Sequence, residues 1–193
     1  MEKEALLRFI QSVLPISQAK AEEIIAPFSP ISFSKNSFFL EEGKISHQYL
    51  FLEQGFMRAF THDLDGNEVT TGFFTDNQLV FEVASFFLRT PSNENIQALA
   101  DCKCWYITFD QLQFLFHSIP EFREFGRTVL VKGFISFKQR TLSMINQTAE
   151  QRYETLIKNS PEIFQQAPLK YIASYLGITD TSLSRIRKEI SLK

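Results

Sequence analysis

The stretch 168–190, PLKYIASYLGITDTSLSRIRKEI, constrains the fold of this 193-residue chain more than any other part of it. Apolar residues recur there at helical spacing on both sides of one glycine: Ile172, Ala173 and Leu176 precede it, and Leu183, Ile186 and Ile190 follow it. Gly177 stands where the end of a helix favours the left-handed backbone that glycine adopts easily. Thr179 and Asp180 are both suitable N-caps for a second helix. The stretch therefore predicts two short helices that pack across a tight turn.

The outer face of the second predicted helix carries short polar and cationic side chains: Thr181, Ser184, Arg185, Arg187 and Lys188. An α-helix is narrow enough to enter the major groove of B-DNA, and such side chains suit base edges and phosphates. The spacing of the small and branched apolar residues fits the helix-turn-helix pattern. An ordinary αα-hairpin at the end of a helical bundle is the structural alternative.

Helical position suggests which part of DNA each side chain would touch. Base edges would be contacted from the first two turns by Thr181, Ser184 and Arg185. Phosphates would be contacted by Lys170, Thr179, Ser182, Arg187 and Lys188. Arg185 is the best candidate for a bidentate contact with guanine. Asp180 is expected to cap the helix and to suit its dipole, with a contact to cytosine N4 as the alternative.

Charge is distributed unevenly along the chain. The formal net charge is −2, but residues 138–193 carry +4, with nine Lys or Arg against five Asp or Glu. The first 137 residues carry −6. An acidic body with a basic C-terminal segment would aim one end of the molecule at phosphate and keep nonspecific affinity for DNA modest.

Composition indicates a globular protein of the reducing cytoplasm. The chain is 44% hydrophobic and 22% charged, and its 21 Phe residues can supply a dense core. The N-terminus, MEKEALLRFI, lacks the apolar run of a signal peptide, and no apolar run approaches a membrane span. Cys102 and Cys104 would share one face of a strand, so free thiols are expected and a redox pair is the alternative.

Residues 31–107 are rich in strand signals. Short apolar runs alternate there with turn residues, and Leu64-Asp65-Gly66-Asn67 is typical of a hairpin turn. Roughly eight strands at this spacing predict a small antiparallel jelly roll. A break at 77–95 suggests a short helix whose free backbone N–H groups would lie near the mouth of the barrel and could bind an anion.

Helical spacing also occurs on both sides of the strand-rich region. Helices are predicted over residues 3–14, 18–26, 111–117, 121–146 and 149–158. The helix 121–146 has two apolar lines, more than one neighbour can cover. We expect one line to pack on the barrel and the other on a second subunit, as in a parallel coiled coil. A long helix that packs on its own barrel alone is the alternative.

The order of these elements resembles the Crp/Fnr family of bacterial transcription regulators. The most specific matches are SYLGITDTSLSRIRKEI and the spacing EEG…QYLFLEQG…DLDGNEV. Gln151-Arg152-Tyr153 and Pro161-Glu162 resemble the short form of these regulators in Bacteroidetes-type bacteria. The resemblance implies a homodimer on a two-fold symmetric operator with half-sites about one helical turn apart. RNA polymerase is a further partner to be considered, and the β-hairpin wing that usually follows the second helix is expected to be absent or truncated.

The same resemblance argues against a cyclic nucleotide as effector. Family members that bind cyclic AMP carry a Gly-Glu pair and, later, an Arg followed by Ala or Ser. Phe81-Glu82 and Ser92-Asn93-Glu94 stand at these places, and an acidic residue there would repel a phosphodiester. The candidates for contact with an unknown small effector are Glu82, Arg89, Ser92 and Asn93. Two cysteines are too few for an iron–sulfur sensor, and His47, His62 and His117 are too scattered to suggest haem or metal ligation.

We therefore expect an α+β protein in three parts: a jelly-roll sensor domain (1–118), a dimerisation helix (119–147, with 121–146 at the interface) and a helix-turn-helix unit (148–193). The expected function is that of a non-enzymatic, DNA-binding regulator with no certain cofactor and no membrane partner. The alternative is a ligand-binding or cupin-like jelly roll without a DNA role. A metal-binding cupin would need clustered His and carboxylate residues.

Overall fold

The computed structural model describes residues 3–191 and confirms the expected α+β architecture. Two four-stranded antiparallel sheets form the barrel. In spatial order, the first sheet contains β1 (Ser29–Phe33), β8 (Cys102–Thr108), β3 (Gln48–Gln54) and β6 (Gln78–Val80). The second contains β2 (Phe38–Leu40), β7 (Asn95–Ala98), β4 (Met57–His62) and β5 (Glu68–Phe74). The predicted hairpin joins β4 to β5, where Gly66 donates its N–H to the carbonyl of Asp63.

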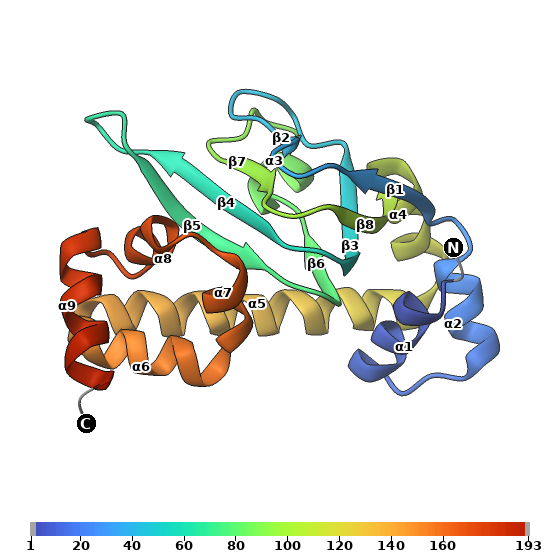
Figure 1. Ribbon diagram of the computed structural model, residues 1–193. Coiled ribbons are helices and arrows are strands. Elements are labelled where there is room, and N and C mark those ends of the chain that lie inside the picture. The colour runs from blue at the N-terminus through green and yellow to red at the C-terminus, as the bar shows by residue number, and fades with distance from the viewer. Residues whose placement is uncertain (1–2, 192–193) are drawn as a thin grey trace.

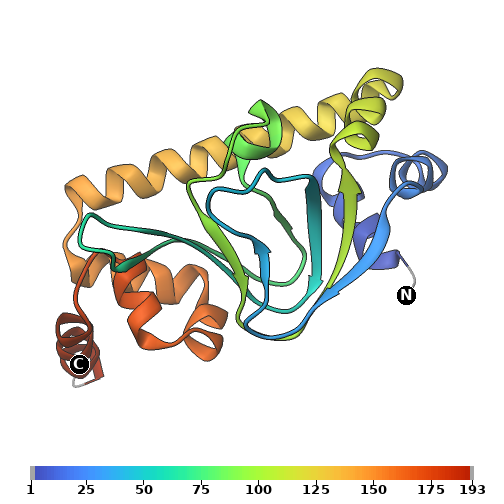
Figure 2. The same ribbon diagram turned by 90° about the horizontal axis from the view of Figure 1, so that it is seen from above.

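Helices lie at both ends of the barrel and along its side (Figures 1 and 2). Those near the N-terminal end are α1 (Glu4–Val13), α2 (Gln18–Ile25) and α4 (Phe109–Ser118). The short α3 (Val83–Leu88) interrupts the strand order, and the 27-residue α5 (Pro120–Asn146) runs the length of the molecule. The C-terminal helices are α6 (Ala149–Asn159), α7 (Pro161–Gln166), α8 (Leu169–Tyr175) and α9 (Asp180–Ser191). Among residues 3–191, no helix has the length and apolar character needed to cross a bilayer.

Local sequence explains most helix boundaries. Thr108 and Thr148 each form a capping box with the glutamine three residues later, which starts α4 and α6. Pro120 occupies the first turn of α5, where its missing N–H leaves no bond unmade. Gly126 lies under the ring of Phe116, so a side chain at this position would force α4 away from α5.

Three apolar clusters hold the fold together. The interior of the barrel contains Leu40, Leu50, Leu52, Met57, Val80, Ile96 and both cysteines. A second, Phe-rich cluster joins the first sheet to α1, α2, α4 and the start of α5. A third cluster joins Phe56 of the barrel to Tyr153, Ile163 and the core of α8 and α9. The C-terminal helices are therefore packed on the barrel as well as on one another.

The long helix is covered by its own chain over part of its surface. Phe122, Phe125 and Gly126, all near its start, are buried. Further along, eight large apolar side chains are at least 43% exposed: Leu130, Val131, Phe134, Ile135, Phe137, Leu142, Met144 and Ile145. This exposure agrees with the expectation that one apolar line of the helix has no partner within its own chain.

The prediction of free N–H groups at the start of the short helix was wrong. The carboxylate of Glu82 accepts hydrogen bonds from the backbone N–H groups of Ala84 and Ser85, and so caps α3 itself. An N-terminus that is already capped by an anion cannot offer those donors to a second one. The segment before it, Gln78–Val80, is a strand rather than part of the helix.

Candidate nucleic-acid interface

The helices α8 and α9 meet across a small buried core. Ile172, Ala173 and Leu176 of α8 are at most 2% exposed, and Leu183 of α9 is fully buried. Ile186 is 6% exposed, whereas Ile178 after the turn is only partly buried. Gly177 has φ +68°, the left-handed conformation expected from the sequence. A Cβ atom at this glycine would lie 2.5 Å from Cε of Met144, so the turn also packs closely on α5.

The first turn of α9 is capped by Thr179, not by Asp180. The hydroxyl of Thr179 accepts from the backbone N–H of Ser182 (3.2 Å) and lies 3.1 Å from the hydroxyl of Thr181. It also donates to the Ser182 hydroxyl (3.0 Å). Asp180 is the first helical residue, where its charge suits the helix dipole. The hydroxyls of Thr179, Thr181 and Ser182 are thus held close together by contacts within this first turn.

The predicted base-contacting residues Thr181, Ser184 and Arg185 are all exposed. At 100° per residue they lie on the side of the helix opposite Leu183 and Ile186. Nε of Arg185 lies 3.9 Å from a carboxylate oxygen of Glu189, one turn later, with both side chains largely exposed. Sequence analysis missed Glu189 as a neighbour, although its i+4 spacing was the available signal.

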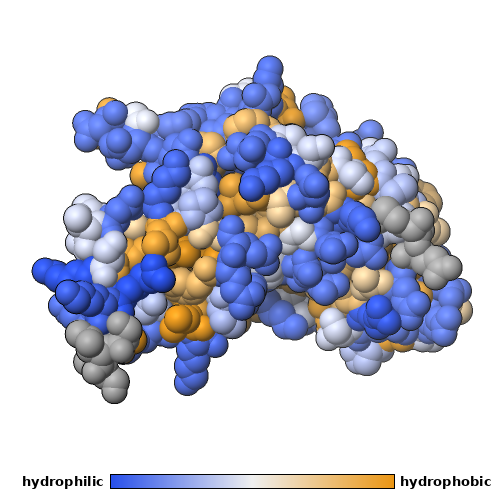
Figure 3. All heavy atoms as spheres, in the orientation of Figure 1, coloured by the Kyte–Doolittle hydropathy of each residue, from blue (hydrophilic) through white to orange (hydrophobic). Residues whose placement is uncertain are grey.

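The predicted phosphate-contacting residues lie on α8, on α9 and in the turn between them. Arg187 and Lys188 are exposed, while Ser182 is partly buried beside Thr179. Lys170 lies on α8, with its ammonium 4.8 Å from the centroid of the Tyr171 ring. Figure 3 shows strongly hydrophilic residues at the α9 end of the molecule, beside apolar residues in the region of α5 to α8. The cationic residues thus lie at the end of the molecule remote from α1 and α2 (Figure 1).

Arg152 fixes the position of this unit. Its Nε and Nη2 donate to the carbonyl of Leu176 (3.1 and 2.9 Å), and its Nη1 donates to the carbonyl of Gln147 (2.7 Å). The end of α8 is therefore tied to the corner between α5 and α6. Tyr153, next in the chain, is 5% exposed in the third cluster. This explains the Gln-Arg-Tyr segment that the sequence singled out.

All four candidate effector residues make hydrogen bonds within the chain, and Glu82 and Arg89 are connected through Ser85 and Ser46. Glu82 caps α3, and Asn93 is exposed, its carbonyl accepting from the Thr61 hydroxyl. Arg89, with φ +59°, donates to the carbonyl of Ser46 (2.5 Å), and its guanidinium lies over the Phe109 ring. Ser92 is 2% exposed and exchanges hydrogen bonds with the backbone of Glu94. The structure does not bring these side chains together around one cavity.

A different polar group lies between the barrel and α5. Burial raises the pKa of Glu94, and the nearby Glu82 carboxylate raises it further, whereas the Thr71 hydroxyl and Arg140 lower it. Arg140 reaches this region from α5, and its Nη2 donates to the carbonyls of Thr70 (3.5 Å) and Tyr175 (3.2 Å). Sequence analysis missed Thr71 and Arg140 because they come from elements far from Glu82 in the chain.

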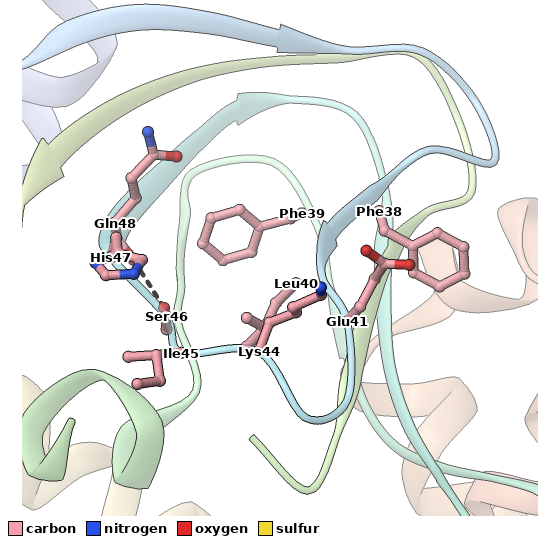
Figure 4. Close-up of a pocket in the computed structure, with 9 residues that line it drawn as sticks. All are labelled: Phe38, Phe39, Leu40, Glu41, Lys44, Ile45, Ser46, His47 and Gln48. Atoms are coloured by element: carbon pink, nitrogen blue, oxygen red, sulfur yellow. Dashed lines mark hydrogen bonds between the residues drawn. The ribbon is translucent and has the colours of Figure 1, made fainter. Parts of the chain in front are cut away.

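One pocket of ≈ 340 Å³ lies beside β2 and β3 (Figure 4). Phe39 points toward the side of His47 and Gln48, and Phe38 points away from it. The polar groups are already engaged: Ser46 donates its N–H to Ser85 and its hydroxyl to Gln48, and Nδ1 of His47 lies 2.8 Å from Nη2 of Arg89. Nothing in this pocket suggests catalytic chemistry.

The cysteines and histidines offer no reactive group in the described part of the chain. Cys102 and Cys104 are free and buried, and burial raises the pKa of Cys104 to about 12. The other two histidines have partners nearby: Nδ1 of His62 lies 3.2 Å from a carboxylate oxygen of Glu42, and Nδ1 of His117 lies 2.7 Å from the carbonyl oxygen of Gln113. Among residues 3–191, no three His, Cys, Asp or Glu side chains are placed to share a metal ion.

Comparison with known proteins agrees with this geometry. Residues 30–118 match the family model "Cyclic nucleotide-binding domain". No curated protein matches the chain. Among solved structures, the c-di-GMP-responsive global regulator CLP of Xanthomonas campestris is 14% identical with a TM-score of 0.71, covering 91% of this chain and 92% of its own.

Two further structures extend the likeness. FixK2 of Bradyrhizobium japonicum is 15% identical, with a TM-score of 0.72 over 86% of this chain and 85% of its own. A putative Crp/Fnr regulator of Eubacterium rectale is 13% identical, with a TM-score of 0.72 over 96% and 88%. The chain therefore has the overall fold of these regulators, and its residues 30–118 match the model of the cyclic nucleotide-binding domain.

Proposed function

We propose that this protein is a sequence-specific, DNA-binding transcriptional regulator of the Crp/Fnr family that acts as a cytoplasmic homodimer. We assign sensing to residues 1–118, dimerisation to 119–147 and DNA binding to 148–193. The observation that carries the proposal is the arrangement of α9, called the recognition helix below. Leu183 and Ile186 anchor it on α8, which leaves Thr181, Ser184 and Arg185 on the opposite, exposed side.

Two copies of the recognition helix would be needed to read a two-fold operator. The exposed apolar line on α5, centred on Phe134, supports dimerisation through residues 121–146. A parallel pair of α5 helices would bury these side chains and hold the two recognition helices on one side of the dimer. RNA polymerase remains a further partner within this proposal.

Selection from a library of genomic fragments, followed by fluorescence anisotropy at two salt concentrations, tests the proposal. We expect enrichment of a two-fold symmetric site that is bound at least about a thousandfold more tightly than random DNA at the same salt. Equal affinity for all fragments, with the same salt dependence, would contradict sequence-specific binding. Metal analysis of the same sample addresses the cupin-like alternative, which requires a bound metal.

The sensor role is proposed for the barrel without a cyclic nucleotide as effector. Support comes from Glu82, whose carboxylate occupies the N-terminus of α3, and from Glu94 close to it. Two carboxylates at this place disfavour a phosphodiester. A thermal-shift screen of nucleotides and metabolites, including cyclic AMP, identifies any effector, and DNA binding repeated with each hit shows whether it regulates.

A further inference from the structure

The helix α8 is held between two neighbours, the recognition helix on one side and the barrel on the other. Its contact with the barrel includes polar groups as well as the apolar packing on Phe56: the backbone N–H of Thr70 donates to the Ser174 hydroxyl (2.8 Å), which donates to the carbonyl of Glu68 (3.2 Å). Beside it, the rings of Phe73 and Tyr175 lie 5.3 Å apart. Any movement of α8 away from β5 would carry the recognition helix with it.

Arg58 of β4 lies at the centre of this contact and is 0% exposed. Its Nη2 lies 2.6 Å from a carboxylate oxygen of Glu68, whose side chain is 42% exposed. The guanidinium carbon lies 4.0 Å from the centroid of the Phe60 ring and 3.5 Å from that of the Tyr171 ring. The cation is thus enclosed between one ring from the barrel and one ring from α8.

The bonding of this arginine is incomplete. Within residues 3–191, Nε and Nη1 of Arg58 are buried and have no hydrogen-bond partner. Burying a charged group with unpaired donors is unfavourable, and the ion pair and the two cation–π contacts offset only part of that penalty. When α8 separates from the barrel, the Tyr171 ring leaves and water can reach these nitrogens. The desolvation of Arg58 therefore opposes docking of α8 on the barrel. Its contacts with Tyr171 and Glu68 favour docking.

We propose that Arg58 is a positioning residue for DNA binding, which sets the balance between docked and released forms of α8 and so the placement of the recognition helix. Its effect on DNA rests on the function proposed above, whereas its effect on docking does not. Two substitutions should move the balance in opposite directions. Arg58→Met keeps an unbranched chain between the two rings and removes the unpaired donors, so it should favour docking. Glu68→Gln leaves the buried cation without its anion, so it should favour release.

Amide hydrogen exchange measured by NMR on the full-length protein reads the docking directly. The N–H of Thr70 on the edge strand β5 is bonded to Ser174 of α8, so its protection requires docking. The N–H of Ala98 donates to the carbonyl of Ser37 (2.9 Å), and Ala98 belongs to the cluster inside the barrel, so this amide serves as the internal control. We expect exchange at Thr70 to slow by roughly fivefold or more in Arg58→Met and to quicken by a similar factor in Glu68→Gln. Exchange at Ala98 should stay unchanged in both.

DNA binding by the same two variants completes the test. Their affinities for the selected operator should shift in opposite directions. Shifts of the same sign at Thr70, no shift there, or equal shifts at Thr70 and Ala98 would overturn the positioning role, because a merely structural arginine would change global stability alone. If the wild-type protein binds no DNA sequence preferentially, the proposed function fails, while exchange at Thr70 still decides whether Arg58 controls docking.

Discussion

Arg185 is the residue of the recognition helix that we most expect to contact a base edge. It is exposed in the second turn of the recognition helix, and its long ion pair with exposed Glu189 would contribute little that DNA must displace. Arg185→Ala should cost about 1–3 kcal/mol on the preferred operator and relax the preference at one base pair of each half-site. Titrations against all single-base variants of the operator measure this. An equal loss on every sequence would show that Arg185 contacts phosphate instead.

Lys188 should behave differently. It lies two turns after Thr181, near the end of the recognition helix, where a phosphate contact is expected. Lys188→Ala should weaken binding to all sequences alike and lower the slope of log affinity against log salt by about one. Affinities of wild type and variant at four or more salt concentrations give the slope. A change in base preference with an unchanged slope would contradict the assignment.

Individual residues differ in how far sequence could predict them. The exposed faces of α9 followed from local spacing, since the residues that define them are near neighbours in the chain. The burial of Arg58 could not be foreseen, because it depends on Tyr171, more than a hundred positions away. Arg89 was expected near an effector, yet it has a left-handed backbone and its side chain donates to the Ser46 carbonyl, a contact between segments 43 residues apart that no local pattern indicates.

At the scale of elements, the turn between α8 and α9 depends on Gly177. Gly177→Ala should destabilise the protein by about 1–2 kcal/mol from backbone strain alone, and further through the contact of the new Cβ with Met144. Adding Met144→Ala should recover the second part only. Gly133→Ala is the control, because a Cβ at this helical position meets nothing within 4 Å, and it should stabilise by about 1 kcal/mol. Urea denaturation of the wild type and these three variants measures the four free energies of unfolding. A Gly177→Ala variant as stable as the wild type would contradict the role of this turn.

The polar group between the barrel and α5 makes a prediction about pH. The pKa of Glu94 is raised in the folded state, chiefly by burial. A carboxyl whose folded pKa exceeds its unfolded value favours the folded state while it is protonated, and this stabilisation is lost as pH rises through the folded pKa. Glu94→Gln should therefore raise Tm more at pH 7 than at pH 4. Thermal unfolding of both proteins across this range tests it, and a gain that does not vary with pH would contradict the expected titration.

Elements were easier to predict than their contacts. The helix predicted over 121–146 is found at 120–146, because Pro120 and the following helical spacing define its start locally. The break at 77–95 was harder: β6 and α3 are short, and the pairing of β6 with β3 distinguishes a strand there from a helix. The packing of α8 on β5 joins segments about a hundred residues apart, which no local pattern records.

At the scale of the whole molecule, dimerisation is the property on which two-fold DNA recognition depends. Phe134, near the centre of the exposed apolar line of α5, is 68% exposed. Phe134→Glu should place a charge where the two helices meet and convert a dimer to a monomer of 22.4 kDa. Gln139→Glu adds the same charge to an exposed position on another side of α5, so it should leave the dimer intact.

Sedimentation velocity of the wild type and both variants, at the same protein concentrations, measures the outcome. Loss of the dimer should also weaken operator binding, because a single recognition helix contacts one half-site and forgoes the gain from a linked second site. Far-UV circular dichroism shows whether Phe134→Glu is still folded. A wild-type protein that sediments as a monomer at every concentration, or a Phe134→Glu variant that remains a dimer, would place the subunit contact elsewhere than on this face of α5.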